Sequence, residues 1–266
     1  MATTPGILAA DLELLRQYDT PTICNVIELF EVRPNHTGYM DQRIKACFPK
    51  IRPMVGYATT ATYRAAAPPT KGSVYRSLAQ QLETFADLPG PAITVYQDLD
   101  EPSVAATFGD VMCTSFKAFG AAGLITSGGG RDLDQVEALD FPCFVGSINP
   151  SHGYCHMPSI GDPVSVGGLM VYQGDLLHGD LNGVTSIPIE IASEVAHITA
   201  EFINAEKVVL DYVSQTPNPT VKGYLEAFDQ LREITGSIRQ RVQQGKVAKI
   251  AREVLARFEE QMGAGL

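Results

Sequence analysis

The chain has 266 residues, of which 45% are hydrophobic and 19% are charged, a mixture typical of globular proteins and not of disordered or fibrous ones. Its 20 lysines and arginines against 30 acidic residues give a formal net charge of −10. This balance argues against nucleic-acid binding and against attraction to an anionic membrane surface, although small anions can still bind in a local pocket. At about 150 residues per domain, the length corresponds to one large domain or one domain with an appendage.

The segment Met1–Gly6 lacks the basic and apolar regions of a signal peptide, and no apolar run approaches the length of a membrane span. The five cysteines are odd in number and scattered, which indicates reduced thiols. We therefore expect a cytoplasmic protein without a membrane segment.

The first part of the chain predicts helices followed by strands. Apolar spacing predicts a helix over 8–18, and Thr20 as an N-cap before Pro21 predicts the start of a second helix. Residues 43–65 then predict strands, residues 73–88 predict a helix, and residues 92–96 predict a buried strand.

The centre of the chain alternates helices and strands, which favours an α/β layer architecture. The predicted order is a helix over 111–119, a strand over 123–126, a triple-glycine turn, a short helix over 132–139 and a strand over 143–145. Residues 163–188 then predict a β-meander with strands at 164–166, 169–172 and 184–187.

After Pro188 the pattern becomes helical over 191–212, and a proline-containing break at 216–219 precedes a charged, amphipathic stretch over 224–262. Two interpretations of this last stretch stay open. It is either an extension that contacts other subunits or covers the substrate, or a helical pair packed on its own domain.

Asp110 lies at the predicted start of a helix, after Gly109. The unpaired amides of a first helical turn attract anions such as a substrate carboxylate. The amides in question are those of Val111, Met112 and Cys113.

A gap of twenty residues separates Asp110 from the pair Arg131 and Asp132, which follows three glycines that would let the backbone approach a ligand. The arginine offers a planar charged fork for a carboxylate or an enolate oxygen, and the aspartate is an oxygen ligand suited to Mg²⁺ or Mn²⁺. Together they suit a 2-oxo acid bound through a divalent cation. The alternative is that Asp110 only caps its helix and that the pair is a surface ion pair.

Two histidine-containing segments are further candidates. His152, Cys155 and His156 could form a Zn²⁺ cluster, line the substrate pocket or be ordinary loop residues. His178 is either an acid–base group or a turn histidine held by neighbouring carboxylates. The glycines do not form a dinucleotide-binding motif, and there is no nucleophile elbow of a serine hydrolase.

These motifs resemble those of the RraA-like family, which includes the regulator of ribonuclease activity A and the 4-hydroxy-4-methyl-2-oxoglutarate/4-carboxy-4-hydroxy-2-oxoadipate aldolases. The resemblance covers roughly residues 15–205. The segments that carry it are Gly109–Met112, Lys117–Gly123, Arg131–Asp132, Gly167–Asp175, Asp180–Val184, Thr20–Ile23 and Val55–Thr59.

The resemblance implies an α/β fold of the αββα sandwich (swivelling β/β/α) type with a C-terminal helical extension. We expect a catalytic domain over 1–215 and the extension over 216–266. The family also implies a homotrimer or a dimer of trimers with active sites between subunits.

The activity implied is that of a metal-dependent (class II) pyruvate aldolase, a lyase that cleaves a 4-hydroxy-2-oxo acid, with oxaloacetate decarboxylation as a possible side activity. By resemblance to the aldolases of the family, Asp132 of this chain would bind Mg²⁺ or Mn²⁺ and Asp110 would hold metal-bound water. Arg131 would stabilise the enolate oxygen. The substrate-contacting residues would be Gly109, Val111, Met112, Cys113 and Arg131.

The chain departs from the family at Ser127, at Gln135 and in the loop 149–156, which leaves the distal part of the substrate open. The general base is also open, with Glu194, Glu201 and Glu206 as candidates from a neighbouring subunit. Two alternative functions are a protein-binding regulator of a ribonuclease and a related enzyme with altered chemistry on a larger carboxylic acid. The presence of Asp110 favours an enzyme, because members that lack this aspartate are not aldolases.

Overall fold

The computed structural model describes residues 6–70 and 74–263, with side chains for 6–70 and 77–245. These residues form two compact units, and each is described by itself. The first comprises Met1–Cys24 and Arg33–His197, and the second comprises Asn25–Val32 and Ile198–Leu266. Two of the three limits fall inside α2 (Thr20–Leu29) and α6 (Ala192–Gln215), and the third, between Val32 and Arg33, follows α2. The domain boundary expected between residues 215 and 216 stays a prediction.

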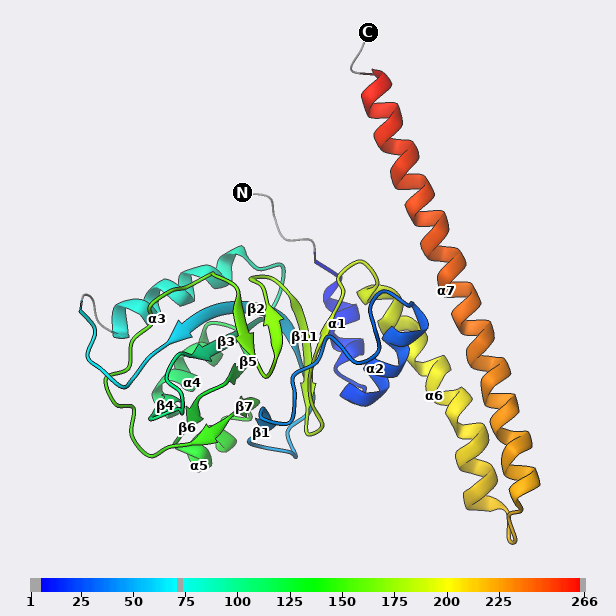
Figure 1. Ribbon diagram of the computed structural model, residues 1–266, viewed down its shortest axis with the longest axis horizontal. Coiled ribbons are helices and arrows are strands. Elements are labelled where there is room, and N and C mark those ends of the chain that lie inside the picture. Colours follow the sequence, from blue (N-terminus) through cyan, green and yellow to red (C-terminus); the bar gives the residue numbers. More distant parts are fainter. Residues whose placement is uncertain (1–5, 71–73, 264–266) are drawn as a thin grey trace. The chain divides into compact units, whose positions relative to one another are not determined.

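The first unit is built on a seven-stranded mixed sheet with the order β1-β7-β5-β3-β2-β11-β12 (Figure 1). Strands β2, β3, β5 and β7 run parallel, and β1, β11 and β12 pair antiparallel at the two sides. The bounds are β1 (Lys45–Ala46), β2 (Met54–Tyr63), β3 (Ala92–Asp98), β5 (Ala121–Thr126), β7 (Cys143–Val145), β11 (Leu176–Asp180) and β12 (Gly183–Ile187).

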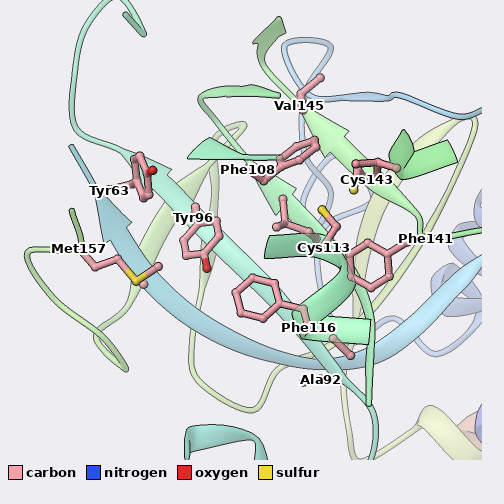
Figure 2. Packing of buried hydrophobic residues seen from close by; sticks show 14 of the residues in the cluster. Tyr63, Ala92, Tyr96, Phe108, Cys113, Phe116, Phe141, Cys143, Val145 and Met157 are labelled. Carbon is pink, nitrogen blue, oxygen red and sulfur yellow. The ribbon is translucent and has the colours of Figure 1, made fainter. Parts of the chain in front are cut away.

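Helices connect the parallel strands, as parallel pairing requires. The helical segments of this unit, apart from α2 and α6, are α1 (Ala9–Leu15), α3 (Val74–Glu83), the 3₁₀ turn η1 (Thr84–Asp87), α4 (Asp110–Ala118) and α5 (Leu133–Ala138). Between this sheet and α4 lies an apolar cluster that contains Tyr63, Tyr96 and Phe116 (Figure 2). The α/β class expected from the sequence is therefore confirmed.

Two smaller sheets complete the unit. Strands β9 (Val164–Val166) and β10 (Leu169–Val171) form a hairpin. Strands β4 (Ala106–Phe108), β6 (Gly129–Gly130) and β8 (Ser147–Ile148) form a parallel sheet in which β6 is central. Each strand of this parallel sheet follows a strand of the large one, so its carboxyl edge gathers three chain segments that are far apart in sequence.

Three details differ from the sequence predictions. Strand β11 was not anticipated, because its buried residues include His178, Gly179 and Asp180, which are poor strand signals. Part of the predicted glycine turn is strand β6. The N-cap of α2 is Asp19, whose Oδ1 accepts a hydrogen bond from the Thr22 amide at 2.7 Å, while the predicted cap Thr20 bonds elsewhere.

The second unit contains α6 from Ile198 onward and α7 (Val221–Gly263), which run side by side. The Thr220 amide donates to Tyr212 Oη at 2.9 Å across the turn between them, and Arg241 pairs with Glu201 at 2.5 Å. Ile238 is fully buried in this unit. The amphipathic stretch predicted over 224–262 is therefore one continuous helix.

None of the helices in the described ranges has the length and apolarity to cross a membrane.

Candidate functional site

The register of the small sheet brings together the two sequence motifs. Phe108 pairs with Gly130 across β4 and β6, so the residues that follow each strand lie at the same edge. The Asp110 amide donates a hydrogen bond to Asp132 Oδ2 at 3.2 Å, and Arg131 Nε lies 3.5 Å from the same oxygen. The twenty residues between the two motifs thus include α4 and β5. These elements lie between β4 and β6 in the chain, although β4 and β6 are neighbours in the small sheet.

A glycine and a left-handed aspartate shape this corner. A Cβ at Gly109 would collide with Asp132 Oδ2 and lie 3.0 Å from Arg131 Nε, so only glycine leaves room for this carboxylate. Asp132 itself has φ of +54°, a conformation that Asp and Asn adopt more readily than other residues with a Cβ. Arg131 and Asp132 each keep 33% of their side-chain surface exposed, so both remain accessible to a ligand.

The first turn of α4 offers fewer free amides than the sequence predicts. The Val111 amide donates to Asp110 Oδ1 at 2.7 Å, and the Cys113 amide donates to Gly109 O at 3.0 Å. Among the first-turn amides of α4, all of which the structure describes, that of Met112 is the one without an acceptor. Cys113 is buried in the apolar cluster near Phe116 and Cys143 rather than directed to a ligand (Figure 2).

The triple glycine serves packing inside the protein. A Cβ at Gly130 would collide with the ring of Phe108, and one at Gly129 would collide with the Asn149 side chain. The absence of side chains at these two positions therefore leaves room for the side chains of Phe108 and Asn149. The expectation that these glycines let the backbone approach a ligand stays a prediction.

A pocket of about 270 Å³ opens beside this corner. Five of the predicted substrate-contacting or catalytic residues line it, whereas Cys113 and Asp132 do not; Asp132 adjoins it through its contacts with Asp110 and Arg131. The lining residues are Tyr63, Leu78, Ala106, Thr107, Phe108, Gly109, Asp110, Val111, Met112, Arg131, His152 and Cys155.

The loop after β8 supplies a wall of the pocket through His152 and Cys155, but not through His156. His152 Nδ1 donates to Gly153 O at 2.8 Å, and Cys155 Sγ lies 3.9 Å from the same nitrogen. His156 Nδ1 instead donates to Tyr154 O at 2.9 Å. The residues with described side chains include no group of three or more His, Cys, Asp or Glu placed to hold a metal ion, so the proposed Zn²⁺ cluster finds no support.

The other candidates lie away from this pocket. His178 is fully buried in β11, where the Thr20 hydroxyl donates to Nδ1 at 3.0 Å and Nε2 donates to Leu15 O at 3.1 Å. His178 does not line the pocket, and burial lowers its pKa. None of Glu194, Glu201 and Glu206 lines the pocket of the chain itself, and Glu201 pairs with Arg241.

A second pocket of about 300 Å³ lies along β11 and β12 and is less suited to an acidic substrate. Its described lining includes Asp175 and Glu190 and no lysine, arginine or histidine. Burial raises the pKa of Asp175, so the negative charge of this side chain is disfavoured. The pocket at Arg131 is therefore the candidate functional site.

Sequence reasoning missed Tyr63 and Leu78, which line the pocket from β2 and α3. Burial raises the pKa of the Tyr63 phenol, and the Cys155 thiol adds to this effect. No local motif marks either residue. Tyr63 could have been found only from the strand order, because β2 ends beside β3 with Tyr63 paired to Asp98.

A family model described as RraA-like, Aldolase/RraA, matches residues 20–185. The match spans more than half of the chain and includes both motifs of the site. The chain therefore belongs to the RraA-like family, which includes aldolases and inhibitors of ribonucleases.

Individual relatives agree with this assignment. A protein of Halalkalibacterium halodurans named "Putative 4-hydroxy-4-methyl-2-oxoglutarate aldolase" is 35% identical over 101 residues, which are 38% of this chain and 47% of that relative. The match thus spans about half of that relative's length.

Solved structures show the same fold. The Streptomyces coelicolor protein RraAS2, described as an unusual member of the RNase ES inhibitor RraA family, aligns with a TM-score of 0.61 at 20% identity over 76% of this chain and 96% of that chain. A structure described as novel cellulases from microbes associated with the gut ecosystem aligns with a TM-score of 0.65 at 25% identity, over 78% and 90% of the two chains.

Proposed function

We propose that this protein is a divalent-metal-dependent lyase that releases pyruvate from a 4-hydroxy-2-oxo acid by retro-aldol cleavage, with oxaloacetate decarboxylation as a side reaction. One observation carries the proposal. The pairing of β4 with β6 places Asp110, Arg131 and Asp132 together at the margin of a pocket, at the carboxyl edge of a parallel sheet. The homologue named as an aldolase supports the same class of reaction.

The substrate carboxylate is bound by two positive groups of the pocket. The Met112 amide at the N-terminus of α4 offers an unpaired donor and the positive end of the helix dipole. Arg131 supplies a permanent charge with several donors in one plane. An acidic protein with a net charge of −10 needs such local positive groups to hold an anion.

Cleavage breaks the bond between C3 and C4 of the substrate. The C4 hydroxyl loses its proton as C4 becomes a carbonyl, and the electron pair of the broken bond forms the enolate of pyruvate. Arg131 stabilises the negative charge that develops on the C2 oxygen, and such stabilisation lowers the barrier because the charge is absent from the ground state. A proton added at C3 completes the release of pyruvate.

The donor set fits Mg²⁺ or Mn²⁺, which bind through one or two carboxylates and keep several water ligands. Asp132 would hold the ion, since its described contacts all use Oδ2. Asp110, whose Oδ1 accepts the Val111 amide, would hold an ion-bound water. The ion would supply a Lewis acid for the oxygens of the oxo acid.

The cellulase description of one structural relative does not suit this pocket. Glycosidases generally use two carboxyl groups that flank the substrate. The two carboxylates of this site, those of Asp110 and Asp132, lie together at one corner of the pocket instead of flanking it. The oxo-acid proposal uses the residues that are present.

Pyruvate release from several 4-hydroxy-2-oxo acids and from oxaloacetate tests the proposal, with Mg²⁺ and with EDTA. We expect turnover that EDTA abolishes and Mg²⁺ restores. The absence of metal-dependent turnover across the whole panel would refute the proposal.

A further inference from the structure

The helical hairpin of the second unit exposes a group of large apolar side chains beside the turn between α6 and α7 (Figure 1). Two of them lie on α6 and three on α7, and we call them the tip face. They are Leu210, Val213, Val221, Tyr224 and Leu225, with exposed fractions of 59, 43, 77, 40 and 55%. The stretch of α7 beyond Gly245 lies about 30 Å or more along the helix from Leu225, so it does not cover them. Contiguous exposed apolar surface of this kind marks a protein interface.

The side chains of the tip face lie on one side of the hairpin. A helix turns about 100° per residue, so Leu210 and Val213 are offset in one rotational sense from the buried Ala205 of α6. Leu225 and the other α7 members are offset in the same sense from the buried Ala227. Because the two helices run antiparallel, the same sense leads to the same side of the hairpin.

Farther from the turn, another segment of the same unit covers this side. Arg239 Nε lies 3.8 Å from Glu31 Oε1, and Glu31 belongs to the segment Asn25–Val32 at the end of α2. On α6, Thr199 and Phe202 of this side are buried. The tip face is therefore the exposed continuation of a surface that already packs against a helix end.

A second copy of the hairpin fits the tip face. The two contacts across the hairpin described above fix which residues of α6 and α7 lie level, and they place Leu210 level with Leu225. A two-fold axis parallel to the helices keeps this level when α6 of one copy lies against α7 of another. Leu210 of each copy then meets Leu225 of the other, and every helix has antiparallel neighbours, as in an up-down-up-down four-helix bundle.

The charges beside the tip face favour this partner. Lys207 of α6 lies level with Asp229 of α7, and Glu206 of α6 lies within one turn of the level of Arg232. Asp229 and Arg232 pair with each other at 3.5 Å, but their side chains are 74% and 72% exposed and remain accessible. The two-fold arrangement brings the basic residue of one copy to the acidic residue of the other at both levels. Opposite charges at such flanking positions select the partner and the orientation of a helix pair.

We propose that the tip face binds the tip face of a second copy of this chain, and that the two hairpins form a four-helix bundle about a two-fold axis. The proposal is independent of the proposed function, because all of its residues lie in the second unit. Of the two interpretations of the C-terminal stretch, it selects the extension that contacts another subunit.

A cross-link tests the arrangement in the full chain. Leu210→Cys and Leu225→Cys are combined in one variant and treated with diamide, whose azo group takes up the two protons and two electrons released when two thiols form a disulfide. We expect at least about tenfold more covalent dimer on a non-reducing gel than with either single variant, because residues 210 and 225 of different copies lie within reach of a disulfide. The native cysteines contribute equally to all three samples. A double variant that gives no more dimer than the single variants would overturn the proposal.

The mass of the assembly tests the same contact without a cross-link. Leu225→Glu places a charge in the tip face, and Gln230→Glu is its control because Gln230 is exposed on the other side of α7. We expect light scattering to give an even number of chains for the wild type and for Gln230→Glu, and about half of that mass for Leu225→Glu. An odd number of chains in the wild type, or an unchanged mass of a folded Leu225→Glu protein, would overturn the proposal. The cross-link decides if Leu225→Glu does not fold.

Discussion

Asp132 is the residue on which the site depends most, because it joins the two motifs and is the expected metal ligand. Its Oδ2 accepts the Asp110 amide at 3.2 Å and lies 3.5 Å from Arg131 Nε. Its carboxylate occupies the space that Gly109 leaves. One side chain therefore supplies the contacts that shape the corner and one of its two negative charges.

The charge and the geometry can be separated by two substitutions. Asp132→Asn keeps a side chain that tolerates φ of +54° and accepts the Asp110 amide, but removes the charge. We expect pyruvate release to fall about 100-fold or more and Mn²⁺ binding to be lost, with the unfolding free energy within about 1 kcal/mol of wild type. Asp132→Ala should lose activity and an additional stability of about 1–2 kcal/mol. Calorimetric Mn²⁺ titration and thermal unfolding check this, and full activity of Asp132→Asn would contradict the metal assignment.

A substitution at Gly109 tests the geometry of the corner without changing its charge. Gly109→Ala should displace the Asp132 carboxylate and reduce pyruvate release about 100-fold, because small misplacements of catalytic groups are costly. Gly236→Ala in α7 is the control, since a Cβ there meets no neighbour within 4 Å and alanine favours a helix. Assays of the two variants under identical conditions compare them. Equal activity of Gly109→Ala and wild type would show that the corner tolerates displacement.

At the scale of elements, β11 is connected to the α1–α2 segment through the buried His178. Its ring accepts from Thr20 and donates to Leu15 O, so it is neutral in the folded protein. Burial lowers the pKa of His178 below the usual value of 6.5, against an opposing effect of Asp180. Below pH 6.5 the unfolded chain then binds a proton that the folded protein does not.

The stability of the protein should therefore fall as the pH falls below about 6.5, with a contribution from His178 of at most about 1.4 kcal/mol per pH unit. Above this pH the contribution is complete and constant. His178→Asn should unfold more easily at pH 7.5 and should show a shallower pH dependence than wild type between about pH 5 and 6.5. Urea unfolding across this range measures the difference, and parallel curves for the two proteins would contradict the assignment.

Some of these elements could be predicted from the sequence, and others could not. Periodicity and cap signals located α1, α3, α4, α5 and β3 because these signals are local. The pairing of β4 with β6 joins segments that are far apart in the chain. The residues between Asp110 and Arg131 carry no sequence signal that predicts it. The motif could be recognised from its spacing, but its geometry required the strand order.

The part of the pocket away from Asp110 and Arg131 illustrates the same limit. His152 and Cys155 were candidates for a pocket because their loop departs from the family, and the structure places them there. Tyr63 and Leu78 reach the pocket only because β2 and α3 end near it, which is a property of the assembled unit.

At the scale of the whole molecule, the family resemblance predicts a trimer or a dimer of trimers. Exposed apolar side chains at the C-terminal end of α4 and in β8 fit this expectation, since Phe119 is 64% exposed and Ile148 is 59% exposed. We expect light scattering to give the mass of three or six chains. Phe119→Glu together with Ile148→Glu should lower this mass and the activity, whereas Met170→Glu, at a residue that is 49% exposed on β10, should change neither. A wild-type mass of one chain would contradict the prediction.

The central claim is that Asp110, Arg131 and Asp132 form a metal-dependent site that stabilises the enolate of pyruvate. Exchange of the methyl protons of pyruvate in D₂O, followed by NMR, tests it most directly because no distal substrate is needed. The account predicts exchange with Mg²⁺ that EDTA abolishes and that Asp132→Asn lacks. Exchange that persists with EDTA, or no exchange in the wild-type protein with Mg²⁺, would contradict it.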